Sequence, residues 1–246
     1  MVTTLFPLIN RIFIVFYPCF FHFTRYNIVN SFSLVLFQIS INTSMPFNEL
    51  IQALSQSPVA PPEKYTLGTP LFFVNYLDGT APAEPAVACL RLIDGHLKTY
   101  AAMRDSVIRN DATHDNEHTW ETGDAFEFFF QPRYREDYYE AHVTPEQIRL
   151  QLHLQDYRTF RGVPHEQKIC DIGLTVKTQI FRDRNLWLAE MDIPCAAMGM
   201  AVEHVIGSKF VFSRYNYMFD GSKPAITSTQ IFQKTAHFPP LWHVIA

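Results

Sequence analysis

Hydrophobic and polar side chains alternate in short runs along most of the chain after residue 70. The clearest run covers residues 148–155, where an isoleucine and three leucines alternate with arginine, glutamine and histidine. A period of two puts the apolar side chains on one face of an extended strand, so this run predicts a half-buried antiparallel strand. Similar runs predict further strands at residues 71–77, 87–93, 96–103, 126–131, 138–144, 174–181, 187–193 and 209–219.

Turn residues such as Asp78-Gly79 and Asp94-Gly95 separate these runs. About nine or ten short strands with little helix between them predict an all-β fold, an antiparallel β-sandwich of the jelly-roll or immunoglobulin-like type. The pattern disfavours a parallel α/β fold. One short N-terminal helix is expected from Met45, because apolar residues recur there at helical spacing and Ser44 can cap the helix.

Residues 1–44 differ from the rest, because they contain two arginines but no lysine, aspartate or glutamate. The apolar run at 12–23 suits the core of an export signal and is short for a membrane span. The segment is a degenerate export signal, a membrane anchor, or sequence translated upstream of a true start at Met45, and we favour the last. The expected domain is therefore 45–246. It is secreted or periplasmic if 1–44 is an export signal, and otherwise cytoplasmic.

The strand expected at 126–131 has an unusual composition. Phe126, Phe128 and Phe130 fall on one face, and Glu127 lies on the other face beside a further phenylalanine. A carboxylate among phenylalanines either has a buried partner or lines a cleft, because an unpaired buried charge is costly. Under either interpretation, we expect the rest of the structure to be organised around this strand.

Four segments together resemble the carbohydrate-binding modules of family nine and their relatives among DOMON-like β-sandwich domains. These segments are Trp120 with residues 123–129, the strand Y-Y-E-A-H-V at 138–143, W-L-A-E-M-D-I-P at 187–194, and Arg214-Tyr215 followed by 237–239. Their order and rough spacing agree with the family, and the likeness extends from about residue 71 to residue 245.

The resemblance implies non-catalytic binding of an oligo- or polysaccharide, a connection with polysaccharide breakdown, and structural calcium. Trp120 and Glu127 match a binding aromatic and its acidic neighbour. The family also uses a second ring, for which this chain has no tryptophan at an obvious equivalent. Tyr215, Tyr217 or Phe219 is the candidate for that ring.

An aromatic ring can stack on the apolar face of a pyranose while flanking polar groups bond its hydroxyls. The candidate ligand-binding residues are Trp120, Glu127, Tyr138, Glu140, Arg214, Tyr215 and Tyr217. Each has a plainer alternative. Trp120 could cover the end of the sandwich, Arg214 could form a buried ion pair with a partner such as Glu127, and the strand face shared by Tyr138 and Glu140 could be solvated. Trp187 is predicted in the core, because a tryptophan buries a large area. Trp242 is predicted to be a plug that closes the domain.

The composition excludes some partners. The net charge is −4 and there is no basic stripe, so nucleic acid is not an expected partner. No membrane contact is expected unless residues 1–44 are a real anchor. The four cysteines lack C-x-x-C spacing, which disfavours a zinc knuckle or a redox dithiol and predicts free, buried thiols.

The polar loop at 109–118 holds the candidate metal ligands. A calcium site that uses Asp111 and Asp115 is conceivable, because oxygen ligands on a loop suit a hard cation. His114 and His118 are four residues apart and would face each other only on a helix, so a zinc site is disfavoured here.

Two other functions stay open. The chain has no G-x-S-x-G, H-E-x-x-H, phosphate-loop or G-x-G-x-x-G motif. A glycoside hydrolase that acts on O-glycosyl bonds needs only two carboxylates about 5 Å apart, and Glu127, Glu140 and Glu190 are candidates. The third possibility is a structural or interaction domain whose own side chains fill the cleft.

Overall fold

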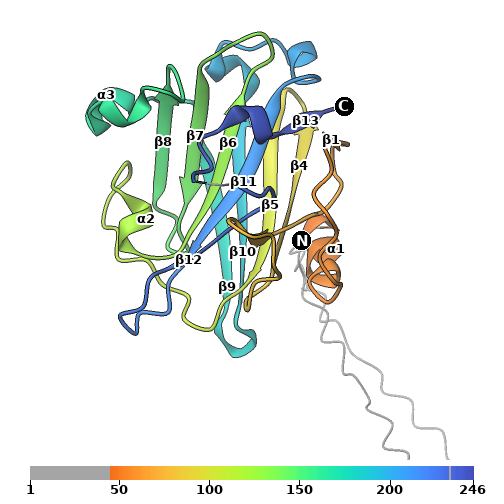
Figure 1. The fold of residues 1–246 in the computed structure, drawn as a ribbon, viewed down its shortest axis with the longest axis vertical. Coiled ribbons are helices and arrows are strands. Elements are labelled where there is room, and N and C mark those ends of the chain that lie inside the picture. Colours follow the sequence, from red (N-terminus) through yellow and green to blue (C-terminus); the bar gives the residue numbers. More distant parts are fainter. Residues whose placement is uncertain (1–44, 233) are drawn as a thin grey trace, which may run out of the picture. The chain divides into compact units, whose positions relative to one another are not determined.

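Two β-sheets stack against each other in the described part of the chain, residues 45–232 and 234–246 of a computed structural model (Figure 1). The larger sheet has eight strands and the smaller sheet has five. This arrangement confirms the predicted all-β sandwich. The boundary after residue 44, the Ser44 cap and the nature of residues 1–44 lie outside the described residues and stay predictions.

The larger sheet contains the strand that the sequence marked as central. Its order is β1 (Lys64–Tyr65), β13 (His243–Ile245), β11 (Lys209–Asn216), β6 (Ala125–Gln131), β7 (Tyr138–Val143) and β8 (Arg149–Leu154). Strand β12 (Ala225–Ser228) also pairs with β11 and with β3 (Val74–Asn75). The β1–β13 pair is parallel and the other pairs of this sheet are antiparallel. Strand β6 therefore lies inside the sheet, between β11 and β7.

The smaller sheet is antiparallel throughout, and one of its strands corrects a prediction. Its order is β2 (Leu71–Phe72), β4 (Ala86–Ile93), β5 (His96–Arg104), β10 (Leu186–Pro194) and β9 (Thr175–Phe181). The single strand predicted at 71–77 is wrong, because β2 belongs to this sheet and β3 to the larger one. Phe73 between them is buried in the core that separates the sheets, so the strand is interrupted where the chain changes sheet.

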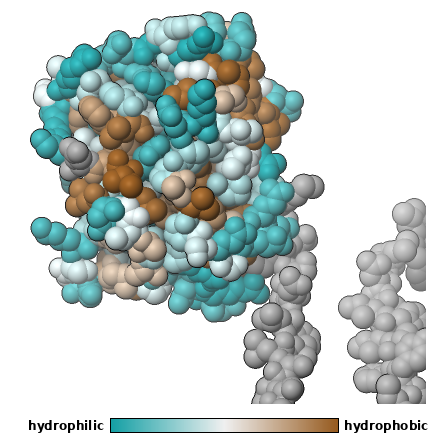
Figure 2. All heavy atoms as spheres, turned by 45° about the vertical axis from the view of Figure 1, so that its right-hand side comes forward, coloured by the Kyte–Doolittle hydropathy of each residue, from teal (hydrophilic) through white to brown (hydrophobic). Residues whose placement is uncertain are grey.

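The helices are short. Helix α1 (Met45–Ala53), which the sequence predicted, packs Leu50 and neighbouring apolar residues against the outward face of the smaller sheet. The others are α2 (Thr119–Thr122), α3 (His165–Lys168), η1 (Phe160–Gly162), η2 (Arg182–Arg184), η3 (Cys195–Met198), η4 (Val202–His204) and η5 (Pro239–Leu241). No helix within the described residues has the length and hydrophobicity to cross a membrane. Figure 2 shows hydrophobic patches interrupted by hydrophilic residues on the face that it presents.

The core between the sheets is rich in aromatic rings. Phe126 and Phe128 of β6 both contact Phe212 of β11, with ring centroids 5.4 and 5.5 Å apart. Trp187 of β10 is fully buried in the same core, as predicted. The alternate residues of each central strand therefore fill this space.

The cysteines of the described residues are free, as predicted. Cys89 and Cys195 are buried, whereas Cys170 is half-buried. Burial raises the pKa of the Cys89 thiol to about 11, so this thiol stays protonated and unreactive at neutral pH.

A second apolar cluster covers the face of the larger sheet that points away from the smaller sheet, which we call the outer face. Phe129 and Tyr138 contribute from the strands, and Phe232 and Trp242 cover them. The predicted burial of Trp242 is confirmed. Since both faces of β6 are covered, all seven of its residues are buried, including Glu127.

A buried ion pair connects the larger sheet to the residue that follows β5. Nη2 of Arg214, a fully buried residue of β11, lies 3.1 Å from Oδ2 of Asp105. Nη2 also donates to the backbone oxygen of Arg104 (2.7 Å), and Nη1 donates to that of Glu84 (3.2 Å). The buried ion pair that the sequence allowed for Arg214 is therefore present, and its partner is Asp105 instead of Glu127.

Asp124 lies close to this ion pair and accepts hydrogen bonds from the backbone nitrogens of Arg109 (2.8 Å) and Tyr217 (2.7 Å). Burial, together with the charge of Asp105, raises the pKa of Asp124 from 3.8 to about 8. Between these two pH values the folded protein holds a proton that the unfolded chain has released. The contribution of Asp124 to stability therefore falls as the pH rises through this window.

We expect Arg214→Met to lower the free energy of unfolding by about 3–5 kcal/mol, because the substitution leaves the buried Asp105 without its cation. Urea denaturation of both proteins measures the difference. The control Arg158→Met removes a more exposed guanidinium that pairs with Asp156, and its effect should stay below about 1 kcal/mol. Equal effects of the two substitutions would contradict the assigned role.

We also expect Asp124→Asn to gain stability relative to the wild type as the pH rises from about 5 to about 8, because the wild type alone must release the Asp124 proton. Urea denaturation along this pH series gives the difference in unfolding free energy. Asp220→Asn is the control, since hydrogen bonds from Ser222 lower the pKa of this exposed carboxyl and keep it charged over the whole range. A difference for Asp124→Asn that does not change with pH would argue against a raised pKa.

Candidate functional site

The outer face of the larger sheet carries polar side chains at its centre. Glu127 of β6 lies opposite His142 of β7, and Phe129 lies opposite Glu140. These residues alternate with core residues such as Phe128, so their side chains point to the outer face. The alternation that predicted the two strands thus also places both carboxylates on one side of the sheet.

A cavity of about 310 Å³ lies over this part of the outer face. The polar side chains of Glu127, Glu140 and Ser213 in the sheet are part of its lining. The other lining residues are Tyr76, Trp120, Phe129, Leu152, Leu154, Phe160, Arg161, Lys168, Tyr215, Ile226, Lys234, Thr235, Ala236 and His237. Aromatic rings, carboxylates and basic side chains therefore border one space.

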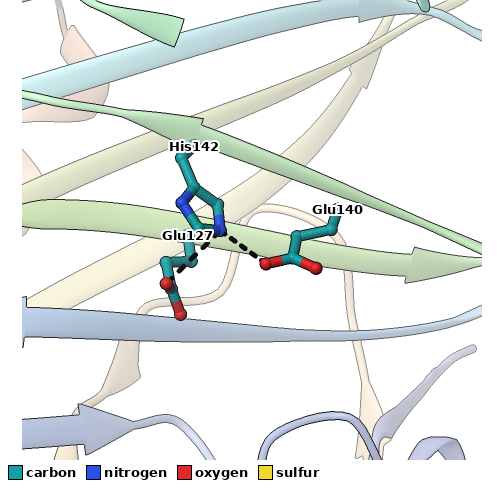
Figure 3. Close-up of side chains that lie close together, drawn as sticks. All are labelled: Glu127, Glu140 and His142. Carbon is teal, nitrogen blue, oxygen red and sulfur yellow. Dashed lines mark hydrogen bonds and ion pairs between the residues drawn. The ribbon is translucent and has the colours of Figure 1, made fainter. Parts of the chain in front are cut away.

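Glu127, Glu140 and His142 lie together where the cavity meets the sheet (Figure 3). Nε2 of His142 lies 2.8 Å from Oε1 of Glu140 and 3.3 Å from Oε1 of Glu127. Nδ1 of the same ring lies 2.8 Å from the hydroxyl of Thr119. His142 is 0% exposed, Glu127 3% and Glu140 4%. One ring nitrogen thus faces two buried carboxylates while the hydroxyl of Thr119 holds the other.

Burial dominates the ionisation of this group. It is the main cause that raises the pKa of Glu127 to about 7, with the charge of Glu140 acting in the same direction and His142 acting against it. Burial also raises the pKa of Glu140 and lowers the pKa of His142. The two carboxyl groups therefore keep protons to a higher pH than exposed glutamates do, beside a neutral imidazole.

Trp120 stands on α2 at the border of the cavity and is half-buried. Its indole stacks on His118, with centroids 4.6 Å apart and planes 20° apart, and lies edge-on to His142 at 5.8 Å. The hydroxyl of Tyr217 donates to the backbone oxygen of Trp120 (2.7 Å). The indole is therefore not sealed in the core, and contacts on two sides fix its orientation.

The structure brings four of the seven predicted ligand-binding residues to the cavity, namely Trp120, Glu127, Glu140 and Tyr215. Sequence analysis did not include His142 among them, although its place two residues after Glu140 puts both side chains on one strand face. It also missed the residues contributed by 156–169, because that segment reads as an ordinary polar loop. The nearness of this loop to the outer face leaves no local pattern in the sequence.

The other three predicted residues do not line the cavity. Tyr138 is fully buried and its hydroxyl lies 2.9 Å from Nδ1 of His237. Tyr217 supports the backbone of Trp120, as described above. Arg214 is held in its buried ion pair and is not available to a ligand in the cavity.

Asp111 and Asp115, the calcium ligands considered from the sequence, each have an arginine partner. Nε and Nη2 of Arg109 each donate to the carboxylate of Asp111 at 2.7 Å. The guanidinium of Arg149 pairs with Asp115, and its backbone nitrogen donates to the same carboxylate at 2.9 Å. Calcium takes about six to eight oxygen ligands. These two carboxylates, both paired with guanidinium groups, do not fit such a site.

Comparison with known proteins gives a likeness of fold. No model of a known protein family matches the chain, and no curated protein matches it. A putative carbohydrate-binding protein from Bacteroides uniformis is 16% identical with a TM-score of 0.53, and the match covers 72% of this chain and 84% of that one. Two structures of a carbohydrate binding module of family 9 from Caldicellulosiruptor kristjanssonii are each 14% identical with TM-scores of 0.49. The match with the glucose complex covers 71% of this chain and 83% of the other, and that with the cellotriose complex covers 74% and 91%.

The likeness to the Bacteroides uniformis protein supports the sandwich fold. At this level of identity it does not carry a function or a set of site residues to this chain. The relation to DOMON-like domains stays a prediction.

Proposed function

We propose that this domain binds carbohydrate without catalysis, in the cavity on the outer face of the larger sheet. One observation carries the proposal. The aromatic rings of Trp120 and Tyr215 line the same cavity as the buried carboxylates of Glu127 and Glu140. Both carboxylates stand on paired strands inside the sheet, so their positions are set by a rigid part of the fold.

The two kinds of side chain match the two kinds of surface on a sugar ring. A pyranose presents C–H groups on its faces, which an aromatic ring such as Trp120 can contact. It presents hydroxyls around its edge. Glu127 and Glu140 can accept hydrogen bonds from these hydroxyls, and Lys168 and Arg161 can donate hydrogen bonds to them. A purely apolar ligand would make no hydrogen bond with these polar groups.

The size of the cavity limits the length of the ligand. Its volume of about 310 Å³ lies at the low end of the range for small-molecule sites, about 300–1,000 Å³. A short saccharide or the end of a chain suits this space better than the middle of a long polymer. Loop residues such as Phe160 and Ala236 border the space above the sheet, so the site is a hollow instead of a flat face.

A protein of similar fold is described with the same class of ligand. The Bacteroides uniformis protein of similar fold is described as a putative carbohydrate-binding protein. The connection of this chain with polysaccharide breakdown rests on the resemblance of its sequence motifs to family nine. The identity of the sugar follows from neither.

Hydrolysis of a glycosidic bond is the second candidate, because Glu127 and Glu140 face the same cavity with ligand atoms within 4.8 Å of each other. A retaining glycosidase has its two carboxyl groups about 5–5.5 Å apart. In this structure, however, Nε2 of His142 lies within 3.3 Å of both carboxylates. The imidazole therefore engages one oxygen of each acid, and binding without catalysis is favoured.

We expect Trp120→Ala to weaken saccharide binding about tenfold or more, because the loss of an aromatic contact of about 1.5 kcal/mol corresponds to that factor. Isothermal titration calorimetry against a panel of plant and microbial oligosaccharides identifies the ligand and measures the change. Tyr134→Ala, which removes an aromatic ring that is 80% exposed and does not line the cavity, should bind as the wild type does.

An absence of heat with every sugar, or an unchanged affinity in Trp120→Ala, would refute the proposal. Release of reducing sugar by the wild type, lost in Glu127→Gln, would instead establish the hydrolase. Both measurements use the full chain, so the two functions are separated with one set of proteins.

A further inference from the structure

The group formed by Glu127, Glu140 and His142 has the composition of a metal site. Each side chain offers one ligand atom, and the three atoms all lie within 4.8 Å of one another. In the described part of the chain, this is the group of histidine, cysteine or acidic side chains whose ligand atoms lie that close together. We propose that Glu127, Glu140 and His142 bind a divalent transition-metal ion of the zinc type at the base of the cavity.

The distances are close to those that an ion requires. Two ligand atoms, each about 2.0–2.1 Å from a tetrahedral zinc ion, lie roughly 3.3 Å from each other. Nε2 of His142 is 3.3 Å from Glu127 Oε1, which matches, and 2.8 Å from Glu140 Oε1, which must lengthen slightly. Rotation about the side-chain bonds of a glutamate is enough to bring its oxygen to this distance.

An unpartnered oxygen provides independent support. Oε2 of Glu140 is buried and has no hydrogen-bond partner among the described residues. Nδ1 of His237 lies 3.8 Å from this oxygen, but that nitrogen lies 2.9 Å from the hydroxyl of Tyr138. A buried carboxylate oxygen without a donor is costly, and a cation bound by both oxygens of Glu140 would satisfy it.

The surroundings of His142 also suit a metal ligand. The hydroxyl of Thr119, 2.8 Å from Nδ1, can accept its hydrogen and leave the lone pair of Nε2 directed at the two carboxylates. Such a hydrogen bond to the second ring nitrogen is usual for histidines that bind metal ions.

The charges around the cavity also favour a bound cation. Lys168 and Arg161 border the cavity, yet none of the ion pairs found in the described part of the chain joins either of them to Glu127 or Glu140. A divalent ion would neutralise both acids at once. Because the donor set includes an imidazole, it favours zinc or a similar ion over calcium, which prefers oxygen ligands alone.

Three protein ligands leave at least one coordination position open, and two of the three ligands, Glu127 and Glu140, line the cavity. In structures of zinc enzymes this open position holds water or a ligand oxygen. Here it could hold water or a hydroxyl of a bound guest. The inference does not depend on the proposed sugar binding, because the ion would occupy the site with or without a saccharide.

The test uses the full chain, freed of metal with EDTA and then freed of EDTA. Titration with Zn²⁺ in a calorimeter should show about one ion bound per chain, with a rise in melting temperature that EDTA reverses. Ca²⁺ should produce neither effect. Substitution by Co²⁺ should give visible absorption bands from the bound ion.

The matched variants are His142→Gln and His114→Gln, because His114 is an exposed histidine beside Glu117 that could bind zinc by chance. His142→Gln should lower the Zn²⁺ affinity at least about tenfold and remove the Co²⁺ bands, whereas His114→Gln should change neither. Glu140→Gln keeps the volume of the side chain and should also lose affinity, so it carries the test if His142→Gln does not fold.

Three results would overturn the proposal. One is wild-type protein that takes up no Zn²⁺ in stoichiometric amount. Another is unchanged affinity in both His142→Gln and Glu140→Gln. The third is a loss of binding in His114→Gln, which would locate the ion in the exposed loop. None of these results would bear on whether the cavity binds a sugar, which the saccharide titration measures separately.

Discussion

The burial of β6 on both faces is the constraint on which the fold and the site depend. On one face, its phenylalanines fill the core between the sheets. On the other face, Glu127 and Phe129 are covered by segments that follow β8 and β12 in the chain. A carboxylate cannot be buried there without a compensating neighbour, and the paired strand β7 supplies His142 opposite to it. The requirement to bury this strand therefore accounts for the covering layer, and the requirement to compensate its acid accounts for the polar group beneath the cavity.

Local periodicity was enough to predict the strands that pair with a neighbour in sequence. Strands β4, β5, β7, β8 and β10 agree with their predicted positions, because each is long enough for an alternation to be visible. Strands β1 and β13 have two and three residues and pair with partners far along the chain. Strand β12 has four residues and pairs both with the nearby β11 and with the distant β3. Such short strands leave no local pattern that marks them. The division of 71–77 between two sheets has the same origin, since a change of sheet at Phe73 depends on what surrounds that ring and not on its neighbours in sequence.

Site residues could be predicted only where a local strand pattern or a sequence motif marks them. Glu127 and Glu140 stand out as acids in aromatic strands, and Trp120 was found through its motif. Arg214 shows the limit, because an arginine between aromatic residues is compatible with both a ligand contact and an ion pair, and Asp105, its partner, is 109 positions away. The cavity wall formed by Phe160, Arg161, Lys168 and residues 234–237 likewise arises from tertiary contacts that only coordinates reveal.

The three tryptophans occupy three different surroundings, and this has a practical consequence for spectroscopy. Trp187 lies between the sheets and Trp242 lies under the outer layer, with 0% and 3% of their surfaces exposed. Trp120 is half-buried at the border of the cavity, in contact with an imidazole that can quench an indole. We therefore expect emission at long wavelength to come mainly from Trp120 at the border of the cavity, and blue-shifted emission to come from the two cores. The same spectrum can then follow the surroundings of the cavity separately from unfolding.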